Sequence, residues 1–357
     1  MIAIQDFKLS GTALPKDAIG MLDEIAEHFT EHSDVLRTGN HVLLKSDIGT
    51  ADIRAEGDRL LIELNSPSDE ALQLVRTMLA EHLFYFAGDD PFELNWSELP
   101  PPASPSNLYE MTVVSAEDVT PRMRRVKFSC ADISPFMRDD MHVRLLVPPK
   151  GRPPVWPGIR EDGRLAWPKG EDKIVVRIYT IRAVDVERRE LWIDFLQHPA
   201  PGVHTPGADF ARDAQPGQTV ALIGPGGGDM PKASRILLVG DESALPAIAR
   251  IAAEAEPGTR LQAIIEVEDE AEQQVLTTRG TLDVQWLHRA NYPTGSTGML
   301  ADEAINAIAP LEADTFIWVA CEKKDVRTIK GVLKTRNHDR KLKYVAWYWE
   351  RGVAARD

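Results

Sequence analysis

Hydrophobic residues change their spacing along the chain, and each change predicts a different kind of structure. Between residues 17 and 98, apolar side chains recur twice at helical spacing, as in Ile19, Leu22 and Ile25, and alternate in short runs in between. Ser68 or Asp69 is expected to cap the second helix, because both are typical of helix starts. The pattern predicts a small α+β domain over residues 1–98, with helices at 17–30 and 70–86 and strands at 41–45, 51–55 and 60–64.

A proline-rich stretch follows this domain. Residues 99–107, LPPPASPSN, have neither a helical nor a strand pattern and are interpreted as a linker. From residue 108 to 230, short β-branched runs alternate with turn residues, which predicts an antiparallel β-barrel. Its expected strands are 109–116, 123–129, 142–148, 174–182, 190–197 and 218–223. An insert at 149–170 carries Trp156 and Trp167, and we interpret it as either a lid over a ligand or a loop packed against the barrel.

The pattern changes once more for residues 231–357. Continuous apolar runs such as RILLVG at 235–240 are typical of buried parallel strands, and helical patterns lie between them. Alternating strands and helices predict a doubly wound parallel α/β domain. The expected strands are 235–240, 261–267, 284–287, 316–321 and 343–348, and the expected helices are 247–255, 299–309 and 325–337.

Charge is unevenly distributed between these segments. The chain carries a net charge of −14, and residues 1–105 hold 19 Asp and Glu against 7 Lys and Arg. This balance argues against a nucleic-acid partner, and no apolar run approaches the roughly 18 residues of a membrane span. Asp6 and Lys8 interrupt the N-terminal apolar residues, so we expect no signal peptide. Cys130 and Cys321 are too few and too far apart for a disulfide framework, which fits the cytoplasm.

The strand KIVVRIYTIR at 173–182 carries the most informative side chains. In a strand, Arg177 and Tyr179 share one face and Thr180 points the other way. A guanidinium for a pyrophosphate, a phenol for a flat ring and a hydroxyl for a ring nitrogen suit a flavin dinucleotide. Taken alone, these four residues favour a β-hairpin with an ordinary surface Arg and Tyr, because Arg-x-Tyr-Thr is a weak pattern. His28 and His32 are spaced like metal ligands on a helix, but a solvated helix face explains them better, and no metal site is predicted.

A barrel with this strand, followed by an α/β half, is the domain order of the ferredoxin-reductase superfamily. Residues 108–357 resemble the siderophore-interacting proteins, which are FAD-dependent ferric-siderophore reductases. The resemblance covers HVRLLVP at 142–148, RIYTIRAVD at 177–185, LWIDFLQH at 191–198, GPGGG at 224–228, LLVGDESALPAIARI at 237–251 and AWYWERG at 346–352. Residues 1–98 resemble a small domain of unknown function that is sometimes fused ahead of this family.

The resemblance implies roles for individual residues. Arg177 would pair with the FAD pyrophosphate, Tyr179 would lie on the isoalloxazine ring and Thr180 would hydrogen-bond near its reactive nitrogen. The implied FAD residues are Arg177, Tyr179, Thr180, Asp194, Phe195, His198, Ala208 and Asp209. Those implied for NAD(P)H are Gly240, Asp241, Glu242, Ser243, Ala244, Pro246 and Glu322. Arg144, Arg351 and Trp349 would bind the substrate, and no catalytic acid, base or metal ligand is implied.

Three positions depart from the family pattern. Asp209 replaces the usual Ser beside the pyrophosphate, where a carboxylate is unfavourable unless it points away. Cys321 replaces a Gly, and we interpret it as a buried residue at the end of a strand. Glu350 replaces a basic residue near the expected substrate site, which lowers the positive charge there.

The implied function is reduction of a ferric siderophore, with electrons passing from NAD(P)H through FAD to chelated Fe(III). The alternatives are a generic flavin or ferredoxin-type reductase and a siderophore-binding protein without activity. A ferredoxin remains open as the electron donor. Glu266 and Glu268 end the second α/β strand, where an acid can disfavour the 2′-phosphate of NADPH, or they are solvated charges.

Overall fold

A computed structural model of the chain describes residues 6–31, 33–101, 104–197, 205–293 and 295–353. Its contacts divide the chain into two compact units, each assembled from two stretches of sequence. The first unit combines Met1–Leu108 with Pro148–Ile174, and the second combines Tyr109–Val147 with Val175–Asp357. The insert between two barrel strands therefore belongs to the same unit as the N-terminal residues.

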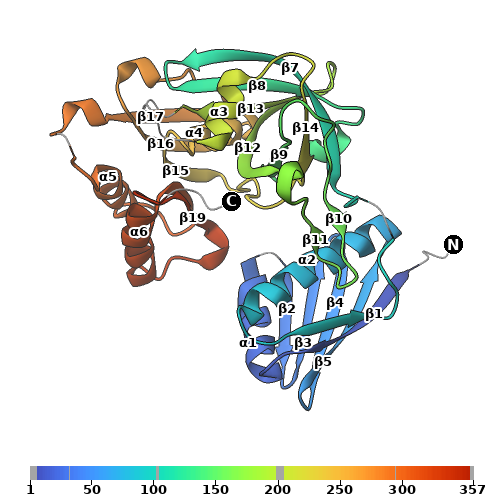
Figure 1. Ribbon diagram of the computed structural model, residues 1–357. Helices are drawn as coiled ribbons and strands as arrows, with labels where there is room; N and C mark the ends of the chain where they lie inside the picture. Colours follow the sequence, from blue (N-terminus) through green and yellow to red (C-terminus); the bar gives the residue numbers. More distant parts are fainter. Residues whose placement is uncertain (1–5, 32, 102–103, 198–204, 294, 354–357) are drawn as a thin grey trace. The chain divides into compact units, whose positions relative to one another are not determined.

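The N-terminal residues form an antiparallel sheet with two helices on one face (Figure 1). The strand order is β2-β3-β4-β5-β1-β6. Buried and exposed residues alternate along β4 and β5, because one face of the sheet packs against helices and the other does not. Asp17 and Ser68 cap the two helices. The elements are β1 (Phe7–Leu14), α1 (Ala18–His28), β2 (Asp34–Thr38), β3 (His41–Ser46), β4 (Gly49–Glu56), β5 (Arg59–Ser66), α2 (Asp69–Ala87) and β6 (Glu93–Trp96).

The insert docks onto α2 and β6 through a short hairpin of β10 (Gly158–Ile159) and β11 (Leu165–Ala166). The Trp96 indole donates to the Asp162 carbonyl at 2.9 Å, and the Glu81 carboxylate accepts from the Leu165 amide at 2.8 Å. The Arg164 guanidinium lies 3.3 Å from the centre of the Phe84 ring. These contacts correct our interpretation of the insert as a lid or a loop on the barrel, since its hairpin packs on the N-terminal sheet and helix.

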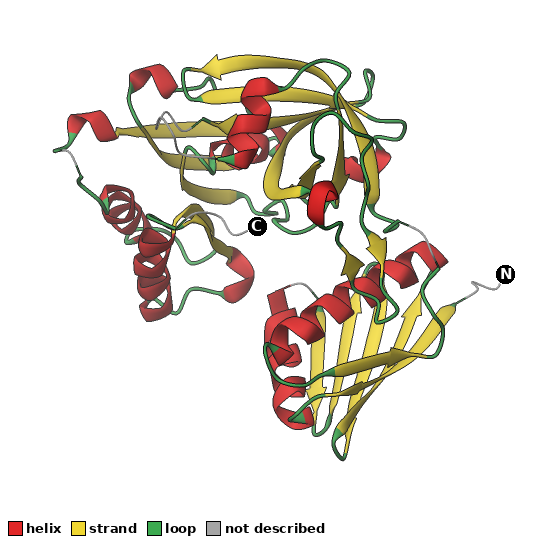
Figure 2. Cartoon of the chain, viewed as in Figure 1, coloured by secondary structure: helices red, strands yellow, loops and turns green. Residues whose placement is uncertain are grey.

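The barrel is closed, with the strand order β12-β13-β8-β7-β14-β9. Phe128, Leu145 and Phe195 are fully buried in its interior, and helix α3 (Pro206–Asp213) adds Phe210 to the same core. All six predicted strands are present, and only their ends differ (Figure 2). The strands are β7 (Leu108–Thr120), β8 (Met123–Ser129), β9 (His142–Val147), β12 (Val175–Asp185), β13 (Glu190–Leu196) and β14 (Thr219–Ile223).

A parallel sheet of order β17-β16-β15-β18-β19 forms the rest of the second unit. Helix α4 packs on one face, while α5 and α6 pack on the other, so the predicted doubly wound arrangement is confirmed. The strands are β15 (Arg235–Asp241), β16 (Arg260–Val267), β17 (Thr281–His288), β18 (Phe316–Glu322) and β19 (Lys343–Trp349). The helices are α4 (Leu245–Glu254), α5 (Met299–Ile308) and α6 (Lys323–Thr335).

Short 3₁₀ turns connect several of these elements. They are Phe29–Glu31, Ser134–Met137, Gly170–Asp172, Glu270–Glu272, Arg289–Asn291 and Arg340–Leu342. Among the helices that the structure describes, none is long and apolar enough to cross a membrane.

Candidate functional site

Strand β12 presents the predicted flavin residues side by side. The Tyr179 ring packs against Phe195, with ring centres 4.3 Å apart. Burial raises the pKa of Tyr179, so its phenol stays protonated. The Tyr179 hydroxyl reaches Gly207 in the first turn of α3, where any Cβ would collide with it. The glycine thus allows the start of a helix to approach the strand that carries Arg177 and Tyr179.

Asp209 lies in this helix, and its carboxylate is turned back toward the helix itself. It accepts a hydrogen bond from the Thr205 amide at 3.1 Å and another from Arg212 at 2.7 Å. Ala208, beside it, is buried. The acid that departs from the family pattern therefore serves as a local helix contact, which reduces its conflict with an anionic ligand at the helix start.

Asp194 and Phe195 on β13 build the wall of the barrel. The buried Asp194 carboxylate accepts two hydrogen bonds from Arg125, at 2.7 and 2.8 Å, and Arg182 lies 3.8 Å away. The bond to Asp194 raises the pKa of Arg125. Phe195 has no exposed surface. The side chains of both residues point into the protein and can support the flavin strand, whereas His198 lies outside the described residues.

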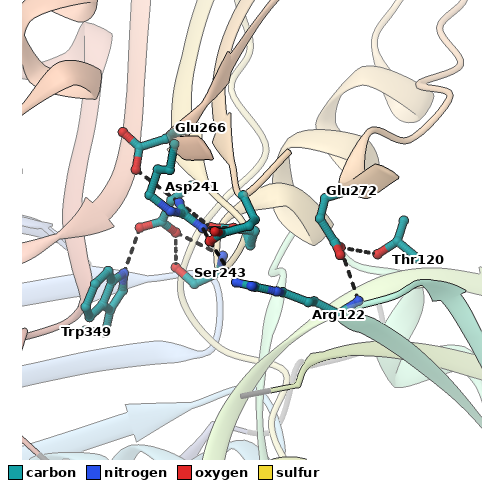
Figure 3. A network of polar contacts seen from close by, with 10 residues as sticks. Thr120, Arg122, Asp241, Ser243, Glu266, Glu272 and Trp349 are labelled. Carbon is teal, nitrogen blue, oxygen red and sulfur yellow. Dashed lines mark hydrogen bonds and ion pairs between the residues drawn. The ribbon is translucent and has the colours of Figure 1, made fainter. Parts of the chain in front are cut away.

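The turn after β15 is tight and holds a buried acid. A Cβ on Gly240 would meet Ala244 and the Ala320 carbonyl, so the turn needs glycine. The Asp241 carboxylate accepts from the backbone amide of Ser243 at 2.9 Å, from the Ser243 hydroxyl, and from the Trp349 indole at 2.7 Å (Figure 3). Burial raises the pKa of Asp241 to about 6. Pro246 lies within the first turn of α4, which begins directly after Ala244.

Glu242 is buried and paired with Arg289, which follows the end of β17. The same guanidinium lies 3.0 Å from Glu266 and 3.5 Å from Glu268. Burial alone would lower the pKa of Arg289, but its hydrogen bonds to Glu242 and Glu266 outweigh burial and raise that pKa. The ends of neighbouring parallel strands meet at one sheet edge, so these acids and Arg289 come together there.

Glu268 is also held by Arg122, at 2.8 Å. Figure 3 shows the continuation of this network, in which Glu272 accepts from the Thr120 hydroxyl at 2.6 Å and from the Arg122 amide at 3.2 Å. Neither Glu266 nor Glu268 is therefore a simple solvated charge. Sequence reasoning overlooked Arg289 and Arg122, although the position of Arg289 just after a parallel strand was a usable signal.

Of the predicted substrate residues, Trp349 ends the C-terminal strand β19, Arg351 follows it, and Arg144 lies on β9. The Arg351 guanidinium lies 5.5 Å from the centre of the Trp349 ring, and the Arg351 amide donates to Glu322 at 3.1 Å. Glu322 also accepts from the Lys324 amide at 2.6 Å and so caps α6. Glu350, which replaces a basic residue, forms an ion pair with Lys323 at 2.6 Å, so its charge is compensated.

A bond that the sequence did not indicate joins β19 to the barrel. The pairing of β18 with β19 shifts after Cys321, which leaves Tyr348 as an extra residue in β19. The Tyr348 hydroxyl lies 3.1 Å from Nε2 of His142, and the other ring nitrogen of His142 lies 3.5 Å from the Thr180 hydroxyl. Burial, with the nearby charge of Arg250, lowers the pKa of His142 to about 4. Exposed Arg144 lies two residues along the same strand as His142.

Arg250 in α4 provides a second link to the barrel. It is almost fully buried and donates to the carbonyls of Arg138 at 3.1 Å and Ile181 at 3.3 Å. These bonds attach α4 to the barrel strand β12 and to the loop before β9. Cys321 is buried and burial raises the pKa of its thiol, which confirms the prediction of a structural residue. Within the described ranges, no group of three or more His, Cys, Asp or Glu side chains is arranged to hold a metal ion.

The donor set fits FAD. The Tyr179 phenol meets the first turn of α3 at Gly207, and Arg177 lies two residues from Tyr179 on the same strand, so a guanidinium, a phenol and the amides of a helix start are available to one ligand. A closed antiparallel barrel followed by a parallel α/β sheet, with this donor set on the barrel, is the arrangement expected of a two-domain flavoprotein.

Comparisons with known proteins agree with this class. Residues 112–229 match the family model of the siderophore-interacting FAD-binding domain, and residues 233–352 match that of the siderophore-interacting protein. Residues 12–97 match a family described as an uncharacterized protein conserved in bacteria, DUF2218. The chain belongs to the siderophore-interacting protein family, with a DUF2218 domain at its N-terminal side.

Relatives named for their activities support the same family. Ferric vibriobactin reductase ViuB of Vibrio cholerae is 30% identical over 240 residues, which cover 66% of this chain and 86% of that protein. The NADPH-dependent ferric-chelate reductase of Escherichia coli is 28% identical and matches 67% of this chain and 92% of its own length. The crystal structure of a siderophore utilization protein from T. fusca aligns with a TM-score of 0.59 at 32% identity, covering 73% of this chain and 97% of that one.

Proposed function

We propose that this protein is a ferric-siderophore reductase that uses NAD(P)H and FAD to reduce chelated Fe(III) and release Fe(II) in the cytoplasm. The observation that carries the proposal is the hydrogen bond from Trp349 to Asp241. It joins the turn suited to a nicotinamide dinucleotide to the segment suited to an anionic chelate. The ferric-reductase names of the relatives support the same reaction.

The residues of the barrel would bind and orient the flavin. Arg177 and the amides at the start of α3 are the groups for the pyrophosphate, and Tyr179 offers a rigid ring. Bound FAD accepts two electrons together and gives them up singly, which matches a nicotinamide donor to a one-electron iron acceptor. The turn after β15 would receive the dinucleotide, because it lies at the carboxyl end of a parallel strand and leads directly into α4, and Ser243 is its half-buried residue.

The proposed substrate site has to attract an anionic ferric chelate and does not need a general acid or base. Arg144 and Arg351 are exposed cations suited to a negatively charged chelate, and each offers a planar guanidinium that can donate two hydrogen bonds to one oxyanion. Siderophores hold Fe(II) more weakly than Fe(III), so reduction is sufficient for release. Thr180, His142 and Tyr348 would keep the meeting point of β9, β12 and β19 ordered through neutral hydrogen bonds.

The visible absorption spectrum of the purified protein tests the proposal. Under anaerobic conditions, flavin bands are expected to bleach with NADH or NADPH and to return on addition of a ferric siderophore. Bands that neither nucleotide bleaches, but that reduced ferredoxin does, would assign a ferredoxin donor. A protein without bound FAD would overturn the proposal and favour a siderophore carrier.

A double substitution separates this function from that of a generic flavin reductase. Arg144→Ala with Arg351→Ala is expected to lower the rate of ferric-chelate reduction more than tenfold, because the chelate loses two cations. Reduction of a small neutral acceptor by the same variant serves as the internal reference. Equal effects on both acceptors would favour the generic reductase.

A further inference from the structure

Two histidines of the N-terminal unit meet where its two helices pack together. His28 ends α1, and His82 lies near the end of α2. Their ring centres are 4.8 Å apart, and the ring planes are tilted by 49°. Both side chains are partly buried, so His28 does not lie on the solvated helix face that we expected from the sequence. His32, the other histidine of that spacing, lies outside the described residues.

Phenyl rings flank the histidine pair. The His28 ring centre lies 5.4 Å from that of Phe29, which is buried, and 5.3 Å from that of Phe86. The His82 ring centre lies 4.9 Å and 6.1 Å from those same two rings. Packing alone would be served as well by phenyl side chains, and burying imidazole nitrogens costs free energy. Two imidazoles in this place therefore indicate a polar role.

A backbone carbonyl orients the ring of His82. Its Nδ1 lies 2.7 Å from the carbonyl oxygen of Met78, one turn earlier in α2. Because a carbonyl only accepts, Nδ1 carries the proton, and Nε2 carries the lone pair of the neutral ring. Histidines that bind metal ions almost always have their other ring N–H held in this way, by a carbonyl or a carboxylate. The bond to Met78 therefore prepares Nε2 of His82 to act as a ligand.

The distance between the two rings fits one shared ion. With metal–nitrogen bonds of about 2.0 Å, two imidazoles on one ion have ring centres about 5 Å apart at the tetrahedral angle and about 4.5 Å apart at a right angle. On opposite sides of a linear ion, the centres would be about 6 Å apart. The observed 4.8 Å matches neighbouring positions on a tetrahedral or octahedral ion and does not match a linear one.

The charge around the pair favours a cation. His28 lies in the last turn of α1, where the helix dipole is negative. Residues 1–105 hold 19 Asp and Glu against 7 Lys and Arg, so the N-terminal segment is acidic as a whole. Arg37 reaches α1, but it is paired there with Asp23 at 2.8 Å. A bound cation would therefore lower the excess of negative charge in this unit.

The ligand type indicates which cation. Imidazole suits divalent first-row transition metals, whereas Mg(II) and Ca(II) prefer oxygen ligands. In the part of the chain that the structure describes, no third His, Cys, Asp or Glu side chain forms a metal-binding group with this pair, so water can take the other positions on the ion. We propose that His28 and His82 form a binding site for a divalent transition-metal ion such as Zn(II) or Fe(II). The site belongs to the first unit, whereas the residues implied for FAD and NAD(P)H belong to the second.

Titration of the full-length, FAD-loaded protein with Zn(II) tests the inference. Calorimetry is expected to detect Zn(II) binding that Mg(II) does not displace. His28→Ala and His82→Ala are each expected to weaken this binding at least about tenfold, because each removes a ligand. Co(II) is expected to give a d–d absorption spectrum in the parent, which reports the geometry of the ion, and to lose that spectrum in both variants.

Two further variants separate metal binding from packing. His82→Phe keeps a ring beside Phe29 and Phe86 but has no nitrogen. Its unfolding midpoint should lie close to that of the metal-free parent, and it should lose the rise in midpoint that Zn(II) gives the parent. His41→Ala is the matched control, because His41 lies on β3 of the same unit and pairs with Asp52 at 3.0 Å. This variant should bind Zn(II) like the parent.

Four results would overturn the inference. They are a parent that binds no Zn(II), equal Zn(II) affinity in the parent and in both alanine variants, a rise in midpoint with Zn(II) that persists in His82→Phe, and a loss in His41→Ala as large as that in His82→Ala. The last result would assign the binding to surface histidines in general.

Discussion

The two units hold distant segments together by different means. In the N-terminal unit, the hairpin of the insert docks through an indole-to-carbonyl hydrogen bond, a guanidinium stacked on Phe84, and close packing around Gly163. In the second unit, segments meet through buried charges, as Arg289 does with Glu242 and Glu266. Close packing holds a surface element in place without burying charged groups. Buried charge pairs also hold side chains in place, but removing one partner leaves the other charge buried and unpaired, which lowers the free energy of unfolding.

The largest expected effect comes from removing the shared cation of the second unit. Arg289→Met would leave the carboxylates of Glu242 and Glu266 unpaired in a mostly buried place, so we expect a loss of about 3 kcal/mol in the free energy of unfolding. Chemical denaturation measures it. Arg235→Met is the matched control, because Arg235 also pairs with two acids, Glu312 and Asp314, but these are largely exposed. Equal losses in the two variants would contradict the contrast between buried and surface pairs.

The next effect concerns the pH dependence of stability at Asp241. Its pKa is raised to about 6 by burial, above the usual value of about 4. The folded chain therefore holds this proton more tightly than the unfolded chain, and the stability from this group is present below about pH 4 and lost as pH rises through 6. Asp241→Asn removes the titration. Between pH 4 and pH 7, the variant should gain roughly 2–3 kcal/mol relative to the parent.

Denaturation midpoints at several pH values check this expectation. A difference between parent and Asp241→Asn that is independent of pH would refute it. Trp349→Phe sharpens the test, because the indole bond favours the ionised carboxylate and its loss should move the transition to higher pH.

A smaller effect is expected in the docked hairpin of the N-terminal unit. Gly163 has φ +90°, and a Cβ there would lie 3.0 Å from the Trp96 indole nitrogen and 3.2 Å from Cγ of Arg76. Gly163→Ala therefore combines backbone strain of about 1 kcal/mol with a steric conflict. Hydrogen exchange of residues 158–166 should accelerate as the hairpin loosens.

Gly151→Ala is the matched control in the same insert. Gly151 has φ +79°, and nothing lies within 4 Å of its added Cβ, so this variant carries the backbone strain alone. Equal exchange rates in the two variants would show that packing around Gly163 does not hold the hairpin.

The smallest effect is expected at Asp209. Asp209→Ser loses the bonds to Thr205 and Arg212, which lie at or near the surface, so stability should fall by less than about 1 kcal/mol. Removal of a negative charge near the proposed pyrophosphate site should tighten FAD binding severalfold. Quenching of flavin fluorescence measures the affinity. An unchanged or weaker affinity would mean that Asp209 does not oppose the cofactor, and Asp213→Ser on the same helix is the control.

Much of the fold could be predicted from the sequence. The alternating runs predicted all six barrel strands, and the continuous apolar runs predicted all five strands of the parallel sheet. The spacing of apolar residues follows which side chains of a strand are buried, so these strands could be recognised from the sequence. The same reasoning missed β1, β2 and β6, because Lys8 and Gly11 interrupt the apolar residues of β1, and β2 and β6 are only five and four residues long. The short strands of the insert carry too few residues for any period to appear.

The sequence by itself determined the kinds of element, their order, and the placing of Arg177 and Tyr179 on one barrel strand. Only the tertiary structure decided the partners: Tyr348 meets His142 across 206 residues, and Trp349 meets Asp241 across 108. The docking of Asp162 on Trp96 is a further example, at a separation of 66 residues. Local spacing reports which face of an element is buried, whereas these contacts depend on which elements the fold brings side by side, and a single sequence has no periodic signal for that.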